Sequence, residues 1–146
     1  MTAKILSVKK GSIADELGIK KGDELLSIDG NTLKDYIEYQ YYNASDELEI
    51  EIKKKNGDIE VFEIEKDFDD DLGLVFESLV FDRIRPCANH CIFCFVDQQP
   101  KGLRDTLYIK DDDYRLSYLQ GTYITLTNLT NRDKERIARE HLGPLF

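Results

Sequence analysis

Two glycine-containing turns enclose a short apolar segment in the sequence Gly18-Ile19-Lys20-Lys21-Gly22-Asp23-Glu24-Leu25-Leu26-Ser27-Ile28-Asp29-Gly30. Glycine adopts positive φ angles at little cost, so Gly18 is expected to end a preceding helix and Gly30 to complete a tight turn. Leu26 and Ile28 are two positions apart, which predicts that both side chains lie on one face of a strand. The segment therefore predicts a strand bounded by turns, which is typical of a β-rich domain.

Short elements are predicted on both sides of this segment. A strand is expected at residues 5–8, and Ser12, with an acidic residue three positions later, predicts the start of a short helix. Thr32, with Asp35 in the reciprocal capping position, predicts the start of a second helix. That helix is expected to bury a single stripe, formed by Leu33, Ile37 and Tyr41.

A β-hairpin is predicted next, with strands at residues 48–53 and 60–65 joined by the turn Asn56-Gly57. An acidic run follows at residues 67–71 and is expected to be a solvated linker. The chain then reads Leu72-Gly73-Leu74-Val75-Phe76, which predicts one more short strand.

Residues 10–14, 18–23 and 28–30 together resemble the PDZ signature of bacterial proteases and their relatives. In the usual PDZ order a Gly-Leu-Gly-Phe-like carboxylate-binding loop precedes this signature. Here a similar stretch, residues 72–76, follows it. The resemblance therefore implies a circularly permuted PDZ-like domain over residues 1–78, in which the last strand takes the place of the usual first one.

The same resemblance implies a partner, namely a peptide or protein C-terminus. Such a peptide adds to the sheet edge as a strand, with its carboxylate held by the backbone N–H groups of the loop. Leu72, Gly73 and Leu74 are the candidate peptide-binding residues. The alternative is that this strand only closes the sheet, since the acidic run ahead of it would repel a carboxylate. The sequence leaves both interpretations open.

All three cysteines of the chain lie in the run Arg85-Pro86-Cys87-Ala88-Asn89-His90-Cys91-Ile92-Phe93-Cys94. An odd, clustered set is a poor disulfide framework. Three thiolates at this spacing can hold three corners of a [4Fe–4S] cluster and leave the fourth iron open. Two alternatives remain: zinc bound with His90 or His141 as a further ligand, and a conventional cluster with a fourth protein ligand.

The pattern Cys-x-x-x-Cys-x-aromatic-Cys resembles the radical S-adenosylmethionine (SAM) superfamily, with Phe93 as the aromatic residue. The resemblance implies that Cys87, Cys91 and Cys94 are the cluster ligands and that the open iron binds SAM. It also implies that Phe93 packs near the adenine of SAM. Reductive cleavage of SAM in this superfamily gives a 5′-deoxyadenosyl radical, which abstracts hydrogen from a substrate.

The PDZ-like head, the cysteine loop and residues 114–128 together resemble a bacterial family of PDZ-headed radical SAM proteins, described as iron–sulfur oxidoreductases without an assigned reaction. The resemblance implies a mixed α+β chain whose residues 79–146 form the start of a βα barrel. Strands are expected at residues 79–84 and 123–127. Helices are expected at residues 114–119, ended by Gly121, and at residues 132–141, capped by Thr130 and Asp133.

A complete (βα)₈ barrel runs to ~250 residues. The chain has 146 residues, so it is expected to be a truncated fragment, too short for catalysis alone unless a partner chain completes the barrel. The expected function is that of a radical SAM iron–sulfur protein that binds a [4Fe–4S] cluster and SAM. The alternative is a PDZ-type peptide-binding module with a vestigial or zinc-binding cysteine loop.

Charge and hydropathy limit the other function classes. The net charge is −9, and every arginine follows residue 82. Acidic residues outnumber lysines in the residues before it, so the first half is strongly acidic. An acidic surface argues against nucleic acid as a partner, because phosphate binding needs positive charge. No apolar run approaches the ~20 residues that span a bilayer, and the N-terminus lacks the pattern of a signal peptide. A cytoplasmic location without membrane contact is therefore expected.

Overall fold

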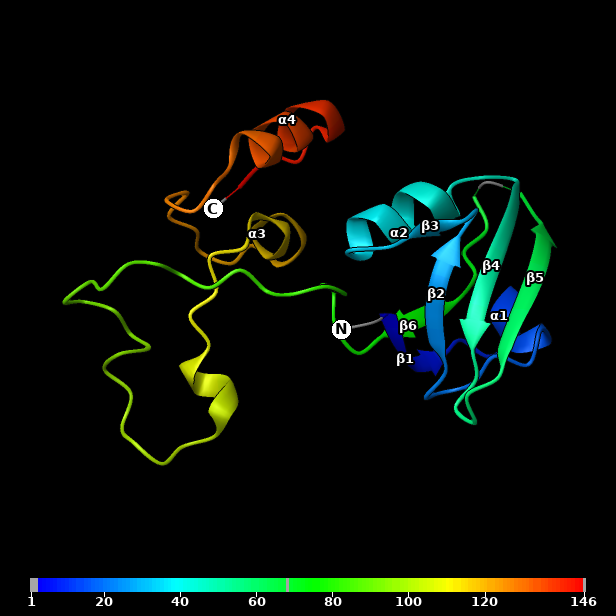
Figure 1. Ribbon diagram of the computed structural model, residues 1–146, viewed down its shortest axis with the longest axis horizontal. Coiled ribbons are helices and arrows are strands. Elements are labelled where there is room, and N and C mark those ends of the chain that lie inside the picture. The colour runs from blue at the N-terminus through cyan, green and yellow to red at the C-terminus, as the bar shows by residue number, and fades with distance from the viewer. Residues whose placement is uncertain (1–2, 68, 146) are drawn as a thin grey trace. The chain divides into compact units, whose positions relative to one another are not determined.

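The computed structural model describes residues 3–67 and 69–145, and the chain divides into two compact units, Met1–Arg83 and Ile84–Phe146 (Figure 1). Phe68, within the acidic run, lies outside the described residues. The sequence analysis placed the division after residue 78. Residues 79–83 belong to the first unit because the Tyr36 N–H donates to the Leu79 carbonyl and the Phe81 N–H donates to the Lys34 carbonyl.

The first unit is an antiparallel sheet with two helices (Figure 1). Its elements are β1 (Ala3–Val8), α1 (Ile13–Glu16), β2 (Glu24–Ile28), β3 (Asn31–Thr32), α2 (Tyr36–Asn43), β4 (Glu47–Lys53), β5 (Ile59–Glu65) and β6 (Leu74–Phe76). The strand order is β5-β4-β2-β1-β6, and β3 pairs with β2. The hairpin of β4 and β5 confirms the predicted turn, because Leu48 pairs with Ile64 and Ile50 with Phe62.

The last strand, β6, closes the sheet in the place that the permuted PDZ interpretation gives it. It pairs antiparallel with β1, with Ser7 opposite Val75. The loop before it is held by α1, because the Ala14 N–H donates to the Leu72 carbonyl at 3.0 Å. Gly73 has a φ of 84°, and a Cβ built there would lie 2.3 Å from the Cβ of Ser12. This close approach requires glycine.

Strand β2 differs from its predicted pattern. Leu25 and Ile28 are buried, whereas Leu26 is half-buried. The pairing of β2 with β4 shifts register between Leu25 and Ser27. Such an irregularity interrupts the alternation of a strand, so the prediction that Leu26 and Ile28 lie on one face is wrong.

Helix α2 also begins later than predicted. Its N-cap is Asp35, whose carboxylate accepts a hydrogen bond from the Glu38 N–H at 3.0 Å, while Thr32 lies in β3. The shift rotates the buried face of the helix. Ile37 is buried as predicted, but Tyr41 is 74% exposed and Tyr39 takes its place in the core.

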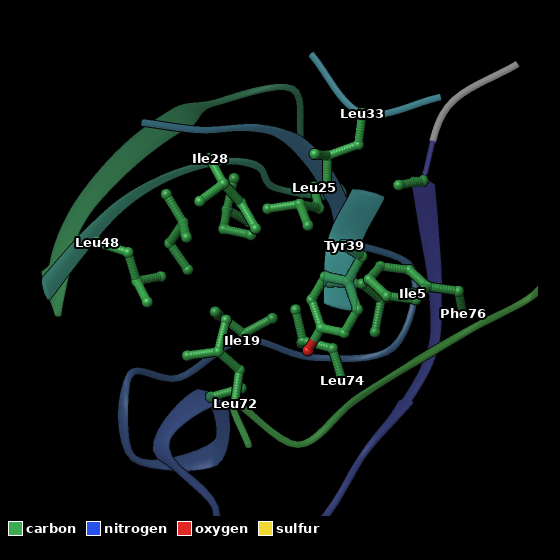
Figure 2. Close-up of a cluster of buried hydrophobic side chains, with 14 of the residues drawn as sticks. Ile5, Ile19, Leu25, Ile28, Leu33, Tyr39, Leu48, Leu72, Leu74 and Phe76 are labelled. Atoms are coloured by element: carbon green, nitrogen blue, oxygen red, sulfur yellow. The ribbon is translucent and has the colours of Figure 1, made fainter. Parts of the chain in front are cut away.

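The core of the first unit lies between the sheet and the two helices (Figure 2). Residues that contribute fully buried aliphatic side chains are Ile5, Ile28, Ile50, Ile52 and Leu72. Each such side chain contributes roughly 1.5–3 kcal/mol relative to an exposed position. The ring of Tyr39 packs edge-on against Phe76, with ring centroids 4.9 Å apart.

The second unit contains α3 (Tyr114–Gln120), α4 (Asn131–Glu140) and a short 3₁₀ helix, η1 (Asp105–Tyr108). Both predicted helices are confirmed. Gly121 ends α3 in the left-handed region, and Thr130 with Asp133 forms the capping box of α4. No helix in the described parts of the chain is both long and apolar enough to cross a membrane.

The two strands predicted for the barrel are absent from residues 79–84 and 123–127, all of which the structure describes, so both predictions are wrong. In the first segment only Val80 makes a bridge, with Asp35. In the second, the N–H and hydroxyl of Thr125 both donate to the carboxylate of Asp112. A side-chain acceptor thus takes the backbone donor that a neighbouring strand would need.

Candidate functional site

The cysteine loop begins on a short extended ribbon that fixes Cys87. The Cys87 N–H donates to the Lys110 carbonyl at 2.6 Å, and the Asp112 N–H donates to the Arg85 carbonyl at 2.8 Å. Pro86 forms a bridge with Asp111 between these two contacts. The first cysteine is therefore held by backbone pairing to the segment that leads into α3.

The other two cysteines lie in a pair of turns. The Cys94 N–H donates to the Cys91 carbonyl at 3.1 Å, and the Gln98 N–H donates to the Cys94 carbonyl at 3.1 Å. All three thiols are free and half-buried. The loop thus presents three reduced sulfur donors that are neither sealed in a core nor paired as a disulfide.

A lysine and an aspartate connect the two ends of this loop. The ammonium of Lys110 lies 2.6 Å from the Asp97 carboxylate. This hydrogen bond raises the pKa of Lys110, and the nearby thiols of Cys94 and Cys87 raise it further. The pKa of Asp97 is lowered, first by Lys110, with a smaller contribution from a hydrogen bond with Cys94. Lys110 therefore places a positive charge near two of the three thiols.

The donor chemistry of the loop fits an iron–sulfur cluster, because soft thiolates are the ligands that such clusters use. Within residues 3–67 and 69–145, no three histidine, cysteine, aspartate or glutamate side chains form a group that could hold a metal ion. The three thiols are therefore not gathered into a metal-binding group in the described residues. The residues fit the cluster by type and connectivity.

Phe93 lies at the surface of the loop and is 72% exposed, with Ile92 and Phe95 exposed on either side of it. Exposed aromatic and aliphatic side chains gathered on one loop are uncommon on a surface that contacts only water. The aromatic face of Phe93 is therefore available to a flat, apolar group. The sequence analysis assigned Phe93 to the adenine of SAM.

A polar network that the sequence analysis missed supports the loop. Asn89, between the first two cysteines, donates from its amide to the hydroxyls of Thr125 and Thr127, at 3.2 and 3.1 Å. Asp112 is only 1% exposed and accepts the N–H and hydroxyl of Thr125, each at 2.6 Å. The signal in the sequence was the run of three aspartates before α3, whose buried members need donors.

The residue two positions before Cys87 anchors the loop to α4. The guanidinium of Arg85 forms a bidentate ion pair with the Asp133 carboxylate. Burial raises the pKa of Asp133, but the hydrogen bonds from Arg85 and Thr130 outweigh it and hold the pKa at about 2. The same Arg85 donates its backbone N–H to Asp113, which pairs with buried Arg115 at 2.7 Å. Charged pairs of this kind fix the position where the loop starts.

A second candidate site lies in the first unit, between α2 and the loop before β6. A cavity of about 250 Å³ is lined by Tyr36, Tyr39, Gln40, Asn43, Ala44, Asp69, Asp70 and Asp71. The predicted peptide-binding residues Leu72, Gly73 and Leu74 are all buried. The lining residues that sequence reasoning missed are Tyr39 and Asp71, which form a hydrogen bond at 3.2 Å. Residue 71, assigned to a solvated linker, is thus part of the cavity wall.

Comparisons with known proteins match both units. The family model described as Radical SAM-like domain matches residues 66–146, and the model described as PDZ domain matches residues 4–54. Among solved structures, the PDZ domain of the SdrC-like protein from Listeria innocua is similar, with 22% sequence identity and a TM-score of 0.44. That match covers 53% of this chain and 96% of the Listeria domain. No curated protein matches the chain.

Proposed function

The chain belongs to the Radical SAM-like domain family, and from this membership we propose that Cys87, Cys91 and Cys94 hold a [4Fe–4S] cluster whose open iron binds SAM. The observation that carries the proposal is the cysteine loop itself. It presents three free thiols in a single short segment inside the matched residues, beside the positive charge of Lys110. When bound, such a cluster supplies the electron that cleaves SAM.

The residues around the loop have distinct roles in this proposal. Cys87 is held by the backbone of Lys110, so the first ligand starts from a fixed position. The Lys110 ammonium offsets part of the negative charge that three thiolates bring to the loop. Asn89 ties the loop to Thr125 and Thr127. Phe93 offers an exposed ring on which the adenine of SAM can stack.

Anaerobic reconstitution of the chain with iron and sulfide tests the proposal. We expect about four irons per chain, the content of one thiolate-bound [4Fe–4S] cluster. After reduction, the electron paramagnetic resonance signal of the cluster should change when SAM is added. Each of the variants Cys87→Ala, Cys91→Ala and Cys94→Ala should lose the cluster. His90→Ala is the matched control inside the loop and should keep it.

Three outcomes would contradict the proposal. Wild-type protein that binds no more iron than the triple cysteine variant would show that the thiols are not cluster ligands. A colourless protein that retains zinc, and loses it in His90→Ala or His141→Ala, would favour a zinc site. A cluster whose spectrum does not respond to SAM would indicate a closed coordination sphere with a fourth protein ligand.

A further inference from the structure

The backbone N–H groups of Gly73 and Leu74 lie beside polar side chains of the first unit. In a PDZ fold, N–H groups of this loop hold the carboxylate of a bound peptide C-terminus. Here the Gly73 N–H lies near enough to the Asp71 carboxylate to lower its pKa, and the Leu74 N–H lies beside the Tyr39 hydroxyl. The two donors that a peptide terminus would need therefore already lie beside acceptor groups of the chain itself.

The Asp71 carboxylate is surrounded by donors in the manner of a bound ligand. The Tyr39 hydroxyl donates to it at 3.2 Å, the Asn43 amide donates at 3.1 Å, and the Lys9 ammonium lies 3.4 Å away. Burial raises the pKa of Asp71, but the Gly73 backbone and the Lys9 ammonium outweigh burial and lower the pKa, so the group is held as a carboxylate.

These donors come from three separate parts of the fold. Lys9 follows β1, Tyr39 and Asn43 lie on α2, and Gly73 precedes β6. Tyr39 is 1% exposed, and Figure 2 shows its ring inside the core with the hydroxyl directed toward Leu72 and Leu74. A buried hydroxyl cannot turn away to water, so its contact with Asp71 is built into the packing of the core.

From this geometry we propose that Asp71 is an internal substitute for a peptide C-terminus, and that the PDZ-like domain of this chain is closed to free C-terminal carboxylates. An incoming carboxylate would have to displace Asp71 from Tyr39 and Asn43. It would also meet the negative charges of Asp69 and Asp70 in the same cavity. Like charges at such short range oppose binding.

The other end of α2 is occupied by the chain as well. The Tyr36 N–H donates to the Leu79 carbonyl at 2.9 Å, and Val80 forms a bridge with Asp35. A peptide strand lying beside β6 would compete with this segment for the first turn of α2. The segment that follows β6 thus adds a second internal contact to the one made by Asp71.

The test compares the wild-type chain with Asp71→Ala on an array of peptides that end in three apolar residues. Each peptide is present as a free carboxylate and as a carboxamide. Wild type should show no preference for the free carboxylate. Asp71→Ala should prefer it by about tenfold or more, equivalent to ~1.4 kcal/mol, because its vacated donors can form charge-assisted hydrogen bonds.

Asp70→Ala is the matched control, because it removes the same charge from the neighbouring residue without vacating the donors. It should behave like wild type. Carboxylate-dependent binding by wild type would overturn the proposal, and so would a folded Asp71→Ala variant that shows none. An equal gain in Asp70→Ala would also overturn it, since repulsion rather than occupancy would then be the cause.

A second measurement applies to wild type alone, in case Asp71→Ala does not fold. The amide resonance of Gly73 should shift when the Asp71 carboxylate is protonated in an acid titration. Gly11 is an internal reference, because its N–H donates to the Asp15 carboxylate at 2.9 Å. A Gly73 resonance that stays still while that of Gly11 moves would overturn the proposal.

Discussion

Asp133 is the carboxylate on which the start of the cysteine loop depends. It pairs with Arg85, and it accepts hydrogen bonds from the N–H and hydroxyl of Thr130, both at 2.8 Å. An unfolded aspartate has a pKa of ~3.9. The pKa of about 2 in the folded chain therefore means that folding favours the ionised form.

We expect the stability contributed by Asp133 to depend on pH. A lowered folded-state pKa gives stability that is complete above ~pH 4 and is lost as the pH falls toward ~2, with a total of about 2 kcal/mol. Asp133→Asn should thus destabilise α4 by about that amount at pH 7 and by little at pH 2. Urea titration at several pH values, followed by the NMR signals of α4, measures both. A difference between wild type and variant that stays constant with pH would contradict this.

The contacts of the Asp71 carboxylate could not be predicted from the sequence. The acidic run looked like a solvated linker because its donors, Lys9, Tyr39 and Asn43, are far away along the chain. The cysteine ligands could be proposed because their chemistry and spacing are local. Residue types that act through distant partners leave no pattern that can be found by reading along the sequence.

The start of helix α2 was also mispredicted from the sequence. The sequence analysis took Thr32 as the N-cap and Asp35 as its reciprocal partner, and this assignment is wrong. The structure uses Asp35, and it pairs the first helical N–H, from Tyr36, with the carbonyl of Leu79 far along the chain. Caps whose choice is purely local, such as Thr130 on α4, were predicted correctly.

Substitution of Asp35 and of Thr32 gives a matched pair of variants that tests which residue caps α2. Asp35→Ala should destabilise the first unit by roughly 1 kcal/mol or more, because it removes a side-chain cap from a helix N-terminus. Thr32→Ala should change stability little, since Thr32 is exposed in β3. Urea unfolding of both variants provides the comparison. A larger loss for Thr32→Ala would mean that the helix starts where the sequence analysis placed it.

The strand predicted at residues 123–127 failed for a related reason. Its β-branched residues have a high strand propensity, but propensity is weak where a specific contact competes with it. Asp112 is buried and takes both donors of Thr125. The PDZ-like sheet was predictable because several of its turns carry a local glycine or hairpin signal. The barrel strands carried no such signal.

The boundary between the two units can be tested with two fragments. Residues 1–83 should fold on their own, because the unit has its own core and includes Val80 and Phe81, which are 0% and 2% exposed. Residues 1–78 lack both side chains and should be less stable by about 3 kcal/mol or more, at roughly 1.5–3 kcal/mol for each buried side chain. Thermal or urea unfolding of the two fragments gives the difference. Equal stability would place the boundary after residue 78.

The pairing of β1 with β6 has a consequence for the order in which the protein can fold during synthesis. β1 is made first, but its partner β6 is made only after every other strand of the sheet. Contacts between residues so far apart along the chain form slowly, and a growing chain must wait for the second of them. The first unit therefore cannot complete its sheet until β6, the last of its strands, has been synthesised and released.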